Sequence, residues 1–282
     1  MASLSWQTRT RRFTLPDRPL IMGILNLSPD SFSDGGLVNG PASAERRARA
    51  LLSAGADLLD VGAESTRPGA APLPADAEKR RLLPVLRRLT RLSAPVSVDT
   101  YKPDVAQAAL SVGAALLNDI RGLNHPDMYR VAAAGRVPLI IMHMRGTPQT
   151  MQRAPRYADV EAEVRRALLA AARRARAAGV PQRHIILDPG IGFGKTARHN
   201  LLLLRGLPRL VRAGYPVLVG PSRKAFLAAV LGPLPPRERV WGTAAAVAWA
   251  VASGARVLRV HDVAEMRMVA QVTAAIRRGK AA

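Results

Sequence analysis

The sequence of 282 residues contains no cysteine. This absence excludes disulfide bonds, a thiolate nucleophile and a zinc ion held by cysteine ligands. Histidine offers no replacement zinc site, because the five histidines at positions 125, 143, 184, 199 and 261 show neither H-x-H nor H-E-x-x-H spacing. A chain without cysteine has no need of an oxidising compartment, and we expect the protein in the cytoplasm.

Long apolar runs are also missing. No stretch approaches the roughly 18 apolar residues that a membrane-spanning helix requires, so we expect no membrane partner. The first 20 residues are rich in arginine and poor in acidic residues, but they lack the apolar segment of a secretion signal. A solvated tail is therefore predicted at the N-terminus.

Acidic and aromatic residues are few. The chain has 42 Lys and Arg against 20 Asp and Glu, a formal net charge of +22, and only 4% aromatics. Much of the charge lies in segments such as EVRRALLAAARRARAAG, where arginines surround an Ala/Leu stripe as on a solvated helix. No basic run alternates with stacking aromatics, and no RRM, KH or zinc-finger pattern occurs. We therefore expect small anionic molecules as partners, and no nucleic acid.

The segment ILDPGIGFGKT looks like a phosphate-binding loop but lacks both nucleotide motifs. A P-loop would require glycine where Pro189 stands, and the pattern G-x-G-x-x-G would require glycine in place of Lys195. What remains is Asp188 at the end of an apolar run, followed by a glycine-lined turn. The role of that carboxylate has to be inferred from the rest of the chain.

One local pattern recurs: a helical stretch ends at glycine and a short apolar run follows, as in SAGADLLDVG and RAGYPVLVG. This is the helix-to-strand junction of a parallel sheet. Six such units, with LIMGILNLS and APVSVDT, predict eight strands that alternate with helices. A spacing of roughly 35 residues predicts an α/β fold, a (β/α)8 TIM barrel. We expect one domain over 1–282, with an N-terminal extension at 1–18 and the barrel at 19–280. A doubly wound open sheet is the alternative.

Each predicted strand ends in a polar or ionisable side chain. These side chains are Asn26, Asp60 and Glu64, Asp99, Asn118, His143, Asp188, Ser222, and Arg259 with His261. A single Asn or Asp in such a place is more often a helix cap than a catalyst. In a barrel, however, all the carboxyl ends of the strands share one rim, where the active site lies. The complete set therefore favours one shared pocket.

Asp99, Asn118 and Asp188 form the first group within this set. A buried carboxylate can accept two hydrogen bonds from an N–C–N edge such as that of a 2-amino-pyrimidinone, and an amide beside it can donate and accept. The group therefore favours a flat nitrogen heterocycle. Buried salt bridges to arginine or lysine are the alternative.

The second group offers donors and fixed positive charge without a carboxylate close in sequence. It comprises Asn26, Arg67, Arg259 and His261. Arginine binds phosphate oxygens in bidentate fashion, so this group predicts an anion site. Ser222 stands at the predicted start of a helix, which favours an anion, and Lys224 follows it. A Mg²⁺ ion held by phosphate oxygens and one side chain, such as Asn26, would leave no further sequence pattern.

Taken together, the sequence resembles the dihydropteroate synthase family from about Met22 to the C-terminal helix. The motifs that carry the resemblance are, in order, GILNLSPDSFSDGG, DVGAESTRPGA, SVDT, LLNDIRG, IIMHMRGTPQTMQ, ILDPGIGFGK, GPSRKAFL and GTAAAVAWAVASGARVLRVHDV. The resemblance implies a transferase of folate biosynthesis, a sulfonamide target and a homodimer. Such an enzyme joins 6-hydroxymethyl-7,8-dihydropterin pyrophosphate to p-aminobenzoate and forms 7,8-dihydropteroate and pyrophosphate.

The resemblance also assigns roles to individual residues. The pterin would be held by Asp99, Asn118, Asp188 and Lys224, with Met142 and Phe193 lining its slot. Pyrophosphate would be bound by Asn26, Arg67, Arg259 and His261, with Mg²⁺ on Asn26. p-Aminobenzoate would be framed by two loops and by Phe32, Thr66, Arg67, Pro68 and Ser222. The catalytic set would be Asp99, Lys224, Asn26, Arg259 and His261.

The family mechanism implied is ionisation. Pyrophosphate leaves first and the aromatic amine attacks the resulting methylene cation, so neither a strong base nor a covalent nucleophile is needed. The sequence departs from the family pattern at Leu27, Ser28 and Ala63, all small changes. Three other functions remain open: a pterin-dependent methyltransferase barrel, a non-catalytic pterin-binding paralogue, and a basic barrel that binds anions or RNA.

Overall fold

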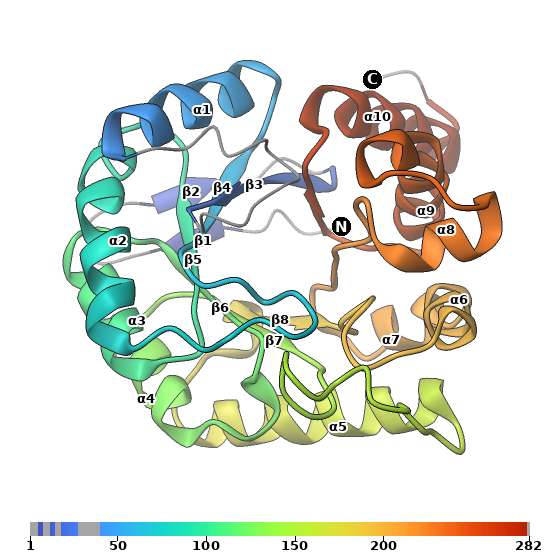
Figure 1. Cartoon of the computed structure of the whole chain (residues 1–282), viewed down its shortest axis with the longest axis horizontal. Helices are drawn as coiled ribbons and strands as arrows, with labels where there is room; N and C mark the ends of the chain where they lie inside the picture. The colour runs from blue at the N-terminus through green and yellow to red at the C-terminus, as the bar shows by residue number, and fades with distance from the viewer. Residues whose placement is uncertain (1–4, 8–11, 15–17, 28–39, 281–282) are drawn as a thin grey trace.

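The computed structural model describes residues 5–7, 12–14, 18–27 and 40–280 (Figure 1). Its centre is a sheet of eight parallel strands. In chain order they are β3 (Leu20–Asn26), β4 (Leu58–Gly62), β5 (Val96–Asp99), β6 (Leu116–Asp119), β7 (Leu139–Met142), β8 (Ile185–Asp188), β9 (Leu218–Val219) and β10 (Val257–Val260). These are the eight strands that the sequence pattern predicts.

The sheet closes into a barrel. Its strand order is β8-β7-β6-β5-β4-β3-β10-β9, and the two end strands are joined by a parallel bridge between Leu187 and Val217. The amide of Leu187 donates to the carbonyl of Pro216 at 2.9 Å, which adds a hydrogen bond at the same seam. The predicted (β/α)8 barrel is thus confirmed, and the open doubly wound alternative is wrong.

Helices form a ring around the strands (Figure 1). They are α1 (Pro41–Ser53), α2 (Ala75–Leu89), α3 (Pro103–Ser111), α4 (Pro126–Gly135), α5 (Val160–Ala177), α6 (Ala197–Arg205), α7 (Leu207–Val211), α8 (Ala225–Leu231), α9 (Val240–Ala252) and α10 (Val263–Arg278). Short 3-10 turns are η1 (Gly122–Asn124), η2 (Gln182–His184) and η3 (Pro236–Arg239). Within the described ranges no helix is long and apolar enough to cross a membrane.

The core has two layers. The barrel interior holds a compact cluster of buried apolar side chains that come from seven of the eight strands. The cluster includes Leu20, Leu58, Leu116, Ile140 and Ile186. A much larger cluster fills the space between strands and helices. This second layer explains the near-continuous apolar composition of the strands, because both of their faces are covered.

Glycine allows the short helix-to-strand junctions. Five junction glycines have positive φ: Gly55, Gly113, Gly179, Gly214 and Gly254. In each case the chain reverses immediately after a helix, a conformation that costs glycine little. The junction after α4 differs, because Arg136 holds the left-handed conformation with φ 55 while Gly135 ends the helix. A Cβ on Gly135 would stand 2.7 Å from Leu110 Cδ1, so this glycine serves packing.

The N-terminal extension contains regular structure that sequence reasoning missed. Strands β1 (Ser5–Gln7) and β2 (Arg12–Thr14) form an antiparallel pair, with Trp6 opposite Phe13. The prediction of a plain solvated tail is therefore wrong for these residues. The physical reason is that two short strands satisfy each other's backbone hydrogen-bonding groups. Strands of three residues are too short to show a recognisable sequence pattern.

Candidate active site

The carboxyl ends of the strands open into a cavity of about 910 Å³. Nine of the side chains predicted from the sequence line it: Asn26, Thr66, Arg67, Pro68, Phe193, Ser222, Lys224, Arg259 and His261. They come from segments far apart in the chain, as expected for the rim of a barrel. Phe32, the remaining residue predicted for p-aminobenzoate, lies outside the described residues.

At one end of the site, Arg259 joins two carboxylates. Its Nε donates to Asp60 Oδ2 at 2.6 Å, and its Nη2 donates to Asp99 Oδ2 at 2.9 Å. Asn118 Nδ2 donates to the same Asp60 oxygen at 3.0 Å. Asp60 is fully buried, and its other oxygen, Oδ1, has no hydrogen-bond partner among the residues that the structure describes. The predicted heterocycle group, which contains Asp99 and Asn118, is therefore connected through Asp60 and Arg259 to the predicted anion group.

This arrangement decides between two alternatives and adds one residue. Arg259 pairs with two carboxylates that lie far from it in the sequence, so the salt-bridge alternative holds for Asp99. Asp60 was recognised as a strand end but received no role. The only signal in the sequence was its place at the end of the second barrel strand, because its partner Arg259 lies 199 residues away.

The pKa of Asp99 is raised to about 7. Burial is the main cause, and the charge of Asp60 adds to it, while Arg259 opposes both. Desolvation disfavours the charged form of a carboxyl group, and a like charge nearby does the same. Asp99 can therefore change its protonation state near neutral pH, unlike an exposed aspartate.

A second buried group lies around Asp188 at the end of β8. Asp188 Oδ1 accepts a hydrogen bond from Gly190 N at 2.7 Å, and Asp188 stands beside Met142 in the strand register. Burial raises the pKa of Asp188, whereas the attraction of Lys224 lowers it. Met142 packs in a small apolar cluster against which Phe193 also packs. Asp188, Met142 and Phe193 thus surround the same part of the site.

Lys224 lies close to this group. Its ammonium lies 4.5 Å from the centre of the Phe193 ring and donates to the carbonyl oxygen of Ile191. Burial lowers its pKa to about 7, an effect that the charge of Asp188 partly offsets. A cation over an aromatic face is a favourable contact. Lys224 therefore provides a hydrogen-bond donor next to a flat apolar wall.

Ser222 and His261 form a pair. The backbone amide of His261 approaches Ser222 Oγ at 3.2 Å, and His261 Nδ1 lies 3.0 Å from the same oxygen. The pKa of His261 is well below its ordinary value, first because of burial and then because Arg223 and Arg259 are close. Ser222 is thus held beside His261 of the predicted anion group, and its role toward p-aminobenzoate stays a prediction.

Arg223 is a second residue that sequence reasoning left without a role. Its guanidinium forms a two-point ion pair with Asp262, with Nε to Oδ2 at 3.0 Å. Arg223 has φ 59, and its carbonyl accepts from Arg239 Nη1 at 3.0 Å. The pair connects the turn that carries Ser222 to the end of β10 that carries His261. The motifs SRK and RVHD contain the partners but do not reveal the contact.

The loop after β4 carries Thr66, Arg67 and Pro68 to the cavity mouth. The amide of Gly69 donates to the carbonyl of Pro148 at 3.0 Å, which ties this loop to the segment after β7. Thr66 is half-buried, whereas Arg67 and Pro68 are exposed. The base of the loop is secured separately, because Glu64 accepts from Tyr101 Oη at 2.9 Å and pairs with Lys102.

The described residues offer no cluster of three or more His, Cys, Asp or Glu that could enclose a metal ion. Asn26, at the end of β3, is half-buried and lines the cavity together with Arg67, Arg259 and His261. A single amide oxygen beside a cationic group fits a Mg²⁺ ion that takes most of its ligands from phosphate oxygens and water. It does not fit a metal held by protein ligands alone.

Comparison with known proteins gives one consistent result. A family model described as "Pterin binding enzyme" matches residues 22–261. The dihydropteroate synthase of Synechocystis sp. is 46% identical over 263 residues, which covers 93% of this chain and 91% of that protein.

Solved structures agree. The Yersinia pestis dihydropteroate synthase in a sulfonamide drug complex has a TM-score of 0.92 at 42% identity and covers 97% of this chain and 99% of its own. The Xanthomonas albilineans dihydropteroate synthase with 4-aminobenzoic acid has a TM-score of 0.90 at 44% identity, with 98% and 99% covered. Fold, order of motifs and similarity over nearly the whole length confirm the resemblance found in the sequence. The chain belongs to the pterin-binding enzymes, in the dihydropteroate synthase family.

Proposed function

We propose that this chain condenses 6-hydroxymethyl-7,8-dihydropterin pyrophosphate with p-aminobenzoate, giving 7,8-dihydropteroate and pyrophosphate. The observation that carries the proposal is the connection made by Arg259, which contacts the buried carboxylates on one side and lines the open cavity on the other. One continuous site can therefore hold a heterocycle at its buried end and an anion at its open end. Membership of the family supplies the identity of the substrates.

The buried end suits the pterin ring. Asp99 and Asp188 offer carboxylate oxygens to ring N–H groups, and Asn118 can both donate and accept. Asn118 is oriented by its bond to Asp60, so its amide is held in place before a ligand arrives. Phe193 and Met142 supply the apolar contact that a flat ring requires. Lys224, over the Phe193 ring, supplies a donor for a ring carbonyl or nitrogen.

The open end suits pyrophosphate. The backbone amide of His261 donates to Ser222 Oγ, so the hydroxyl proton of Ser222 is left for His261 Nδ1. The lowered pKa of His261 keeps the ring neutral, and Nε2 then carries the ring proton and can act as a donor. Arg67 and Arg259 add fixed positive charge. These groups stabilise the charge that grows on the leaving oxygen.

Asn26 is the residue that would hold Mg²⁺. When bound, the ion would neutralise charge on the phosphate oxygens and so favour their departure. The chain's own residues account for the remaining requirements. Arg259, His261 and Arg67 orient the pyrophosphate, and the buried end holds the ring so that its methylene carbon points toward the cavity.

The reaction then needs no covalent enzyme intermediate. The bond between the methylene carbon and the pyrophosphate oxygen breaks, and its electron pair leaves with the pyrophosphate. The amine nitrogen of p-aminobenzoate forms the new C–N bond and releases a proton to solvent. Asp99, next to the ring, stabilises the positive charge on the pterin while that bond is absent.

The decisive experiment is pyrophosphate release by the purified protein with dihydropterin pyrophosphate and Mg²⁺, with and without p-aminobenzoate. We expect release that depends on p-aminobenzoate, with dihydropteroate identified by mass. Binding of dihydropterin pyrophosphate without product would favour the non-catalytic paralogue. No binding at all would reject a pterin site. Omission of Mg²⁺ with excess chelator should lower the rate, and an unchanged rate would reject the metal.

We also propose that the protein acts in the cytoplasm as a homodimer. Helices α9 and α10 lie side by side (Figure 1). Their outer surfaces carry large exposed apolar side chains: Trp241, Trp249, Met268, Val272 and Ile276. An apolar patch of this kind on a folded domain is typical of an interface. Light scattering after gel filtration should give twice the chain mass, and Ile276→Glu should give the monomer. A monomeric wild-type protein would reject the dimer.

A further inference from the structure

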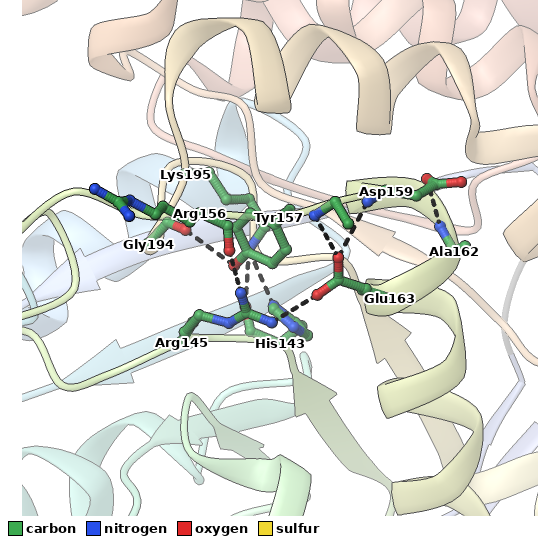
Figure 2. A network of polar contacts seen from close by, with 10 residues as sticks. His143, Arg145, Arg156, Tyr157, Asp159, Ala162, Glu163, Gly194 and Lys195 are labelled. Atoms are coloured by element: carbon green, nitrogen blue, oxygen red, sulfur yellow. Dashed lines mark hydrogen bonds and ion pairs between the residues drawn. The ribbon is translucent and has the colours of Figure 1, made fainter.

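Lys195, the lysine of the ILDPGIGFGK motif, is buried within the wall of the site (Figure 2). Its ammonium lies 2.8 Å from the carbonyl oxygen of Phe193 and 3.2 Å from the carbonyl oxygen of His143. The same nitrogen is 3.2 Å from His143 Nδ1. The lysine of this motif, which lacks the nucleotide-binding patterns, thus contacts two backbone carbonyl groups and an imidazole ring of the protein.

The three contacts match the three protons of an ammonium group. A charged lysine has three donors and no acceptor, so both carbonyl oxygens and the imidazole nitrogen have to accept. His143 can accept only when it is neutral, and burial together with the charge of Lys195 lowers its pKa to about 3. Burial lowers the pKa of Lys195 itself to about 7, an effect that the charge of Asp188 partly offsets. The network is therefore complete, with Lys195 charged and His143 uncharged, at pH values below about 7.

The turn that Lys195 closes is unusually tight. Gly190, Gly192 and Gly194 all have positive φ. A Cβ on Gly190 would stand 2.0 Å from the carbonyl oxygen of His143, and one on Gly194 would stand 2.7 Å from the carbonyl oxygen of Arg145. The turn therefore lies directly on the backbone that follows β7. This close approach brings carbonyl dipoles together, and a cation between them offsets their repulsion.

Other contacts hold the middle and the C-terminal end of this turn, and among them Gly192 N donates to Asn200 Oδ1 at 2.7 Å. Tyr157 Oη donates to the carbonyl of Gly194 at 3.0 Å, and Gln152 Nε2 donates to the carbonyl of Gly192 at 2.9 Å. Figure 2 shows Tyr157 next to Lys195. The guanidinium carbon of Arg145 lies 4.1 Å from the centre of the Tyr157 ring. Phe193 lies between these points, and the contact of its carbonyl with Lys195 secures it.

We propose that Lys195 is a positioning residue that pins the 190–194 turn to the end of β7, and so fixes the Phe193 ring in the pterin slot. This assignment deepens the proposed function and rests on it. Lys195 acts through Phe193 and Lys224, whose ammonium stacks on the Phe193 ring. Loss of the pin allows the ring to move away from Lys224. The effect falls on pterin binding more than on the chemical step.

The first test is Lys195→Met, which keeps the length and apolar stem of the side chain but removes all three donors. We expect the KM for dihydropterin pyrophosphate to rise about tenfold, since hydrogen bonds from a charged group are the strong ones. At saturating dihydropterin pyrophosphate, kcat should change by less than about threefold. Lys79→Met, at a half-buried lysine paired with Asp76 on α2 and outside the cavity lining, is the control and should leave both unchanged.

Backbone hydrogen exchange provides a readout that does not depend on catalysis. In Lys195→Met the amides of 190–194 should exchange at least about fivefold faster than in wild type, while those of α2 stay the same. Unchanged exchange and unchanged KM would overturn the proposal. A wild-type protein that forms no dihydropteroate would reject the proposed function, but the exchange result would still decide whether Lys195 pins the turn.

His143→Phe covers the case in which Lys195→Met does not fold. This change removes one of the three acceptors and leaves both carbonyl contacts. We expect faster exchange over 190–194 and a KM about threefold higher, a smaller effect in the same direction. Wild-type values of both in a folded His143→Phe protein would overturn the proposal.

Discussion

At the scale of single residues, the chemistry of the site depends on two buried carboxylates that share one arginine. Asp60 and Asp99 are two carboxylates with one guanidinium, Arg259, between them. Burial is the main reason that the pKa of Asp99 rises to about 7, and the charge of Asp60 adds to it, while the one positive charge of Arg259 opposes both. A pterin that presents N–H groups would add the missing donors. The free site is thus arranged to gain from ligand binding at Asp99.

The first prediction concerns Asp99→Asn. The substitution keeps the shape of the side chain but removes the charge that faces the developing cation, so kcat should fall at least about 100-fold. Stability should change by only about 1 kcal/mol, because burial already disfavours the charged form and Asp60 still pairs with Arg259. Steady-state kinetics and urea unfolding measure the two quantities. A near-normal kcat would contradict the role of Asp99.

The second prediction concerns pH. Asp99 has to lose its proton to act as a carboxylate, so kcat/KM for dihydropterin pyrophosphate should rise as pH passes its pKa of about 7. Lys224 has to keep its proton, so kcat/KM should fall as pH passes the pKa of Lys224, also about 7. The profile should therefore be a narrow bell near neutrality. Lys224→Arg, charged at every pH used, should lose the alkaline limb. An unchanged alkaline limb would assign it to another group.

At the scale of elements, features that depend on a short stretch of sequence were predictable, whereas contacts between distant segments were not. Every barrel strand was predictable, because a glycine junction and an apolar run are short-range signals. The ends of β5, β6 and β8 correctly placed Asp99, Asn118 and Asp188 at the rim. The pairings of Asp60 with Arg259 and of Arg223 with Asp262 were not predictable, since they depend on side-chain geometry across the closed barrel. The β1–β2 pair was not predicted, because its strands are too short to show an alternating apolar pattern.

The third prediction tests the helix-to-strand junctions. Arg136 is exposed and holds a left-handed conformation at a position where most other junctions have glycine. Arg136→Gly should raise the free energy of unfolding by up to about 1 kcal/mol, because it removes backbone strain. Gly179→Ala is the opposite change: the new Cβ would meet only Ala133 at 3.5 Å, yet φ is +97. It should lower stability by about 1–2 kcal/mol.

Urea unfolding of both variants measures these effects, and kcat should remain that of wild type, because neither residue lines the cavity. A destabilised Arg136→Gly protein would show that the arginine side chain contributes more than its backbone costs. A neutral Gly179→Ala protein would show that this junction can relax.

At the scale of the whole molecule, barrel closure makes the site. Strands β3, β4, β5, β6 and β10 are consecutive in the sheet, but Asp188 at the end of β8 meets Lys224, which follows β9, because the ring joins β8 to β9. The helices outside the ring carry most of the basic excess. Their charges are too distant and too solvated to contact a ligand. They act on substrates through the summed field of the molecule.

The fourth prediction follows from that field and from the formal charge of +22. Dihydropterin pyrophosphate carries several negative charges, whereas p-aminobenzoate carries one, so salt should weaken the binding of the first much more. Between roughly 0.02 and 0.5 M KCl, we expect the KM for dihydropterin pyrophosphate to rise about tenfold and that for p-aminobenzoate less than about threefold. Equal changes would mean that salt acts on the protein itself. If neither KM changed, electrostatic binding would depend only on Arg67, Arg259 and the other residues that line the cavity. The basic outer helices would then have no role in capturing substrate.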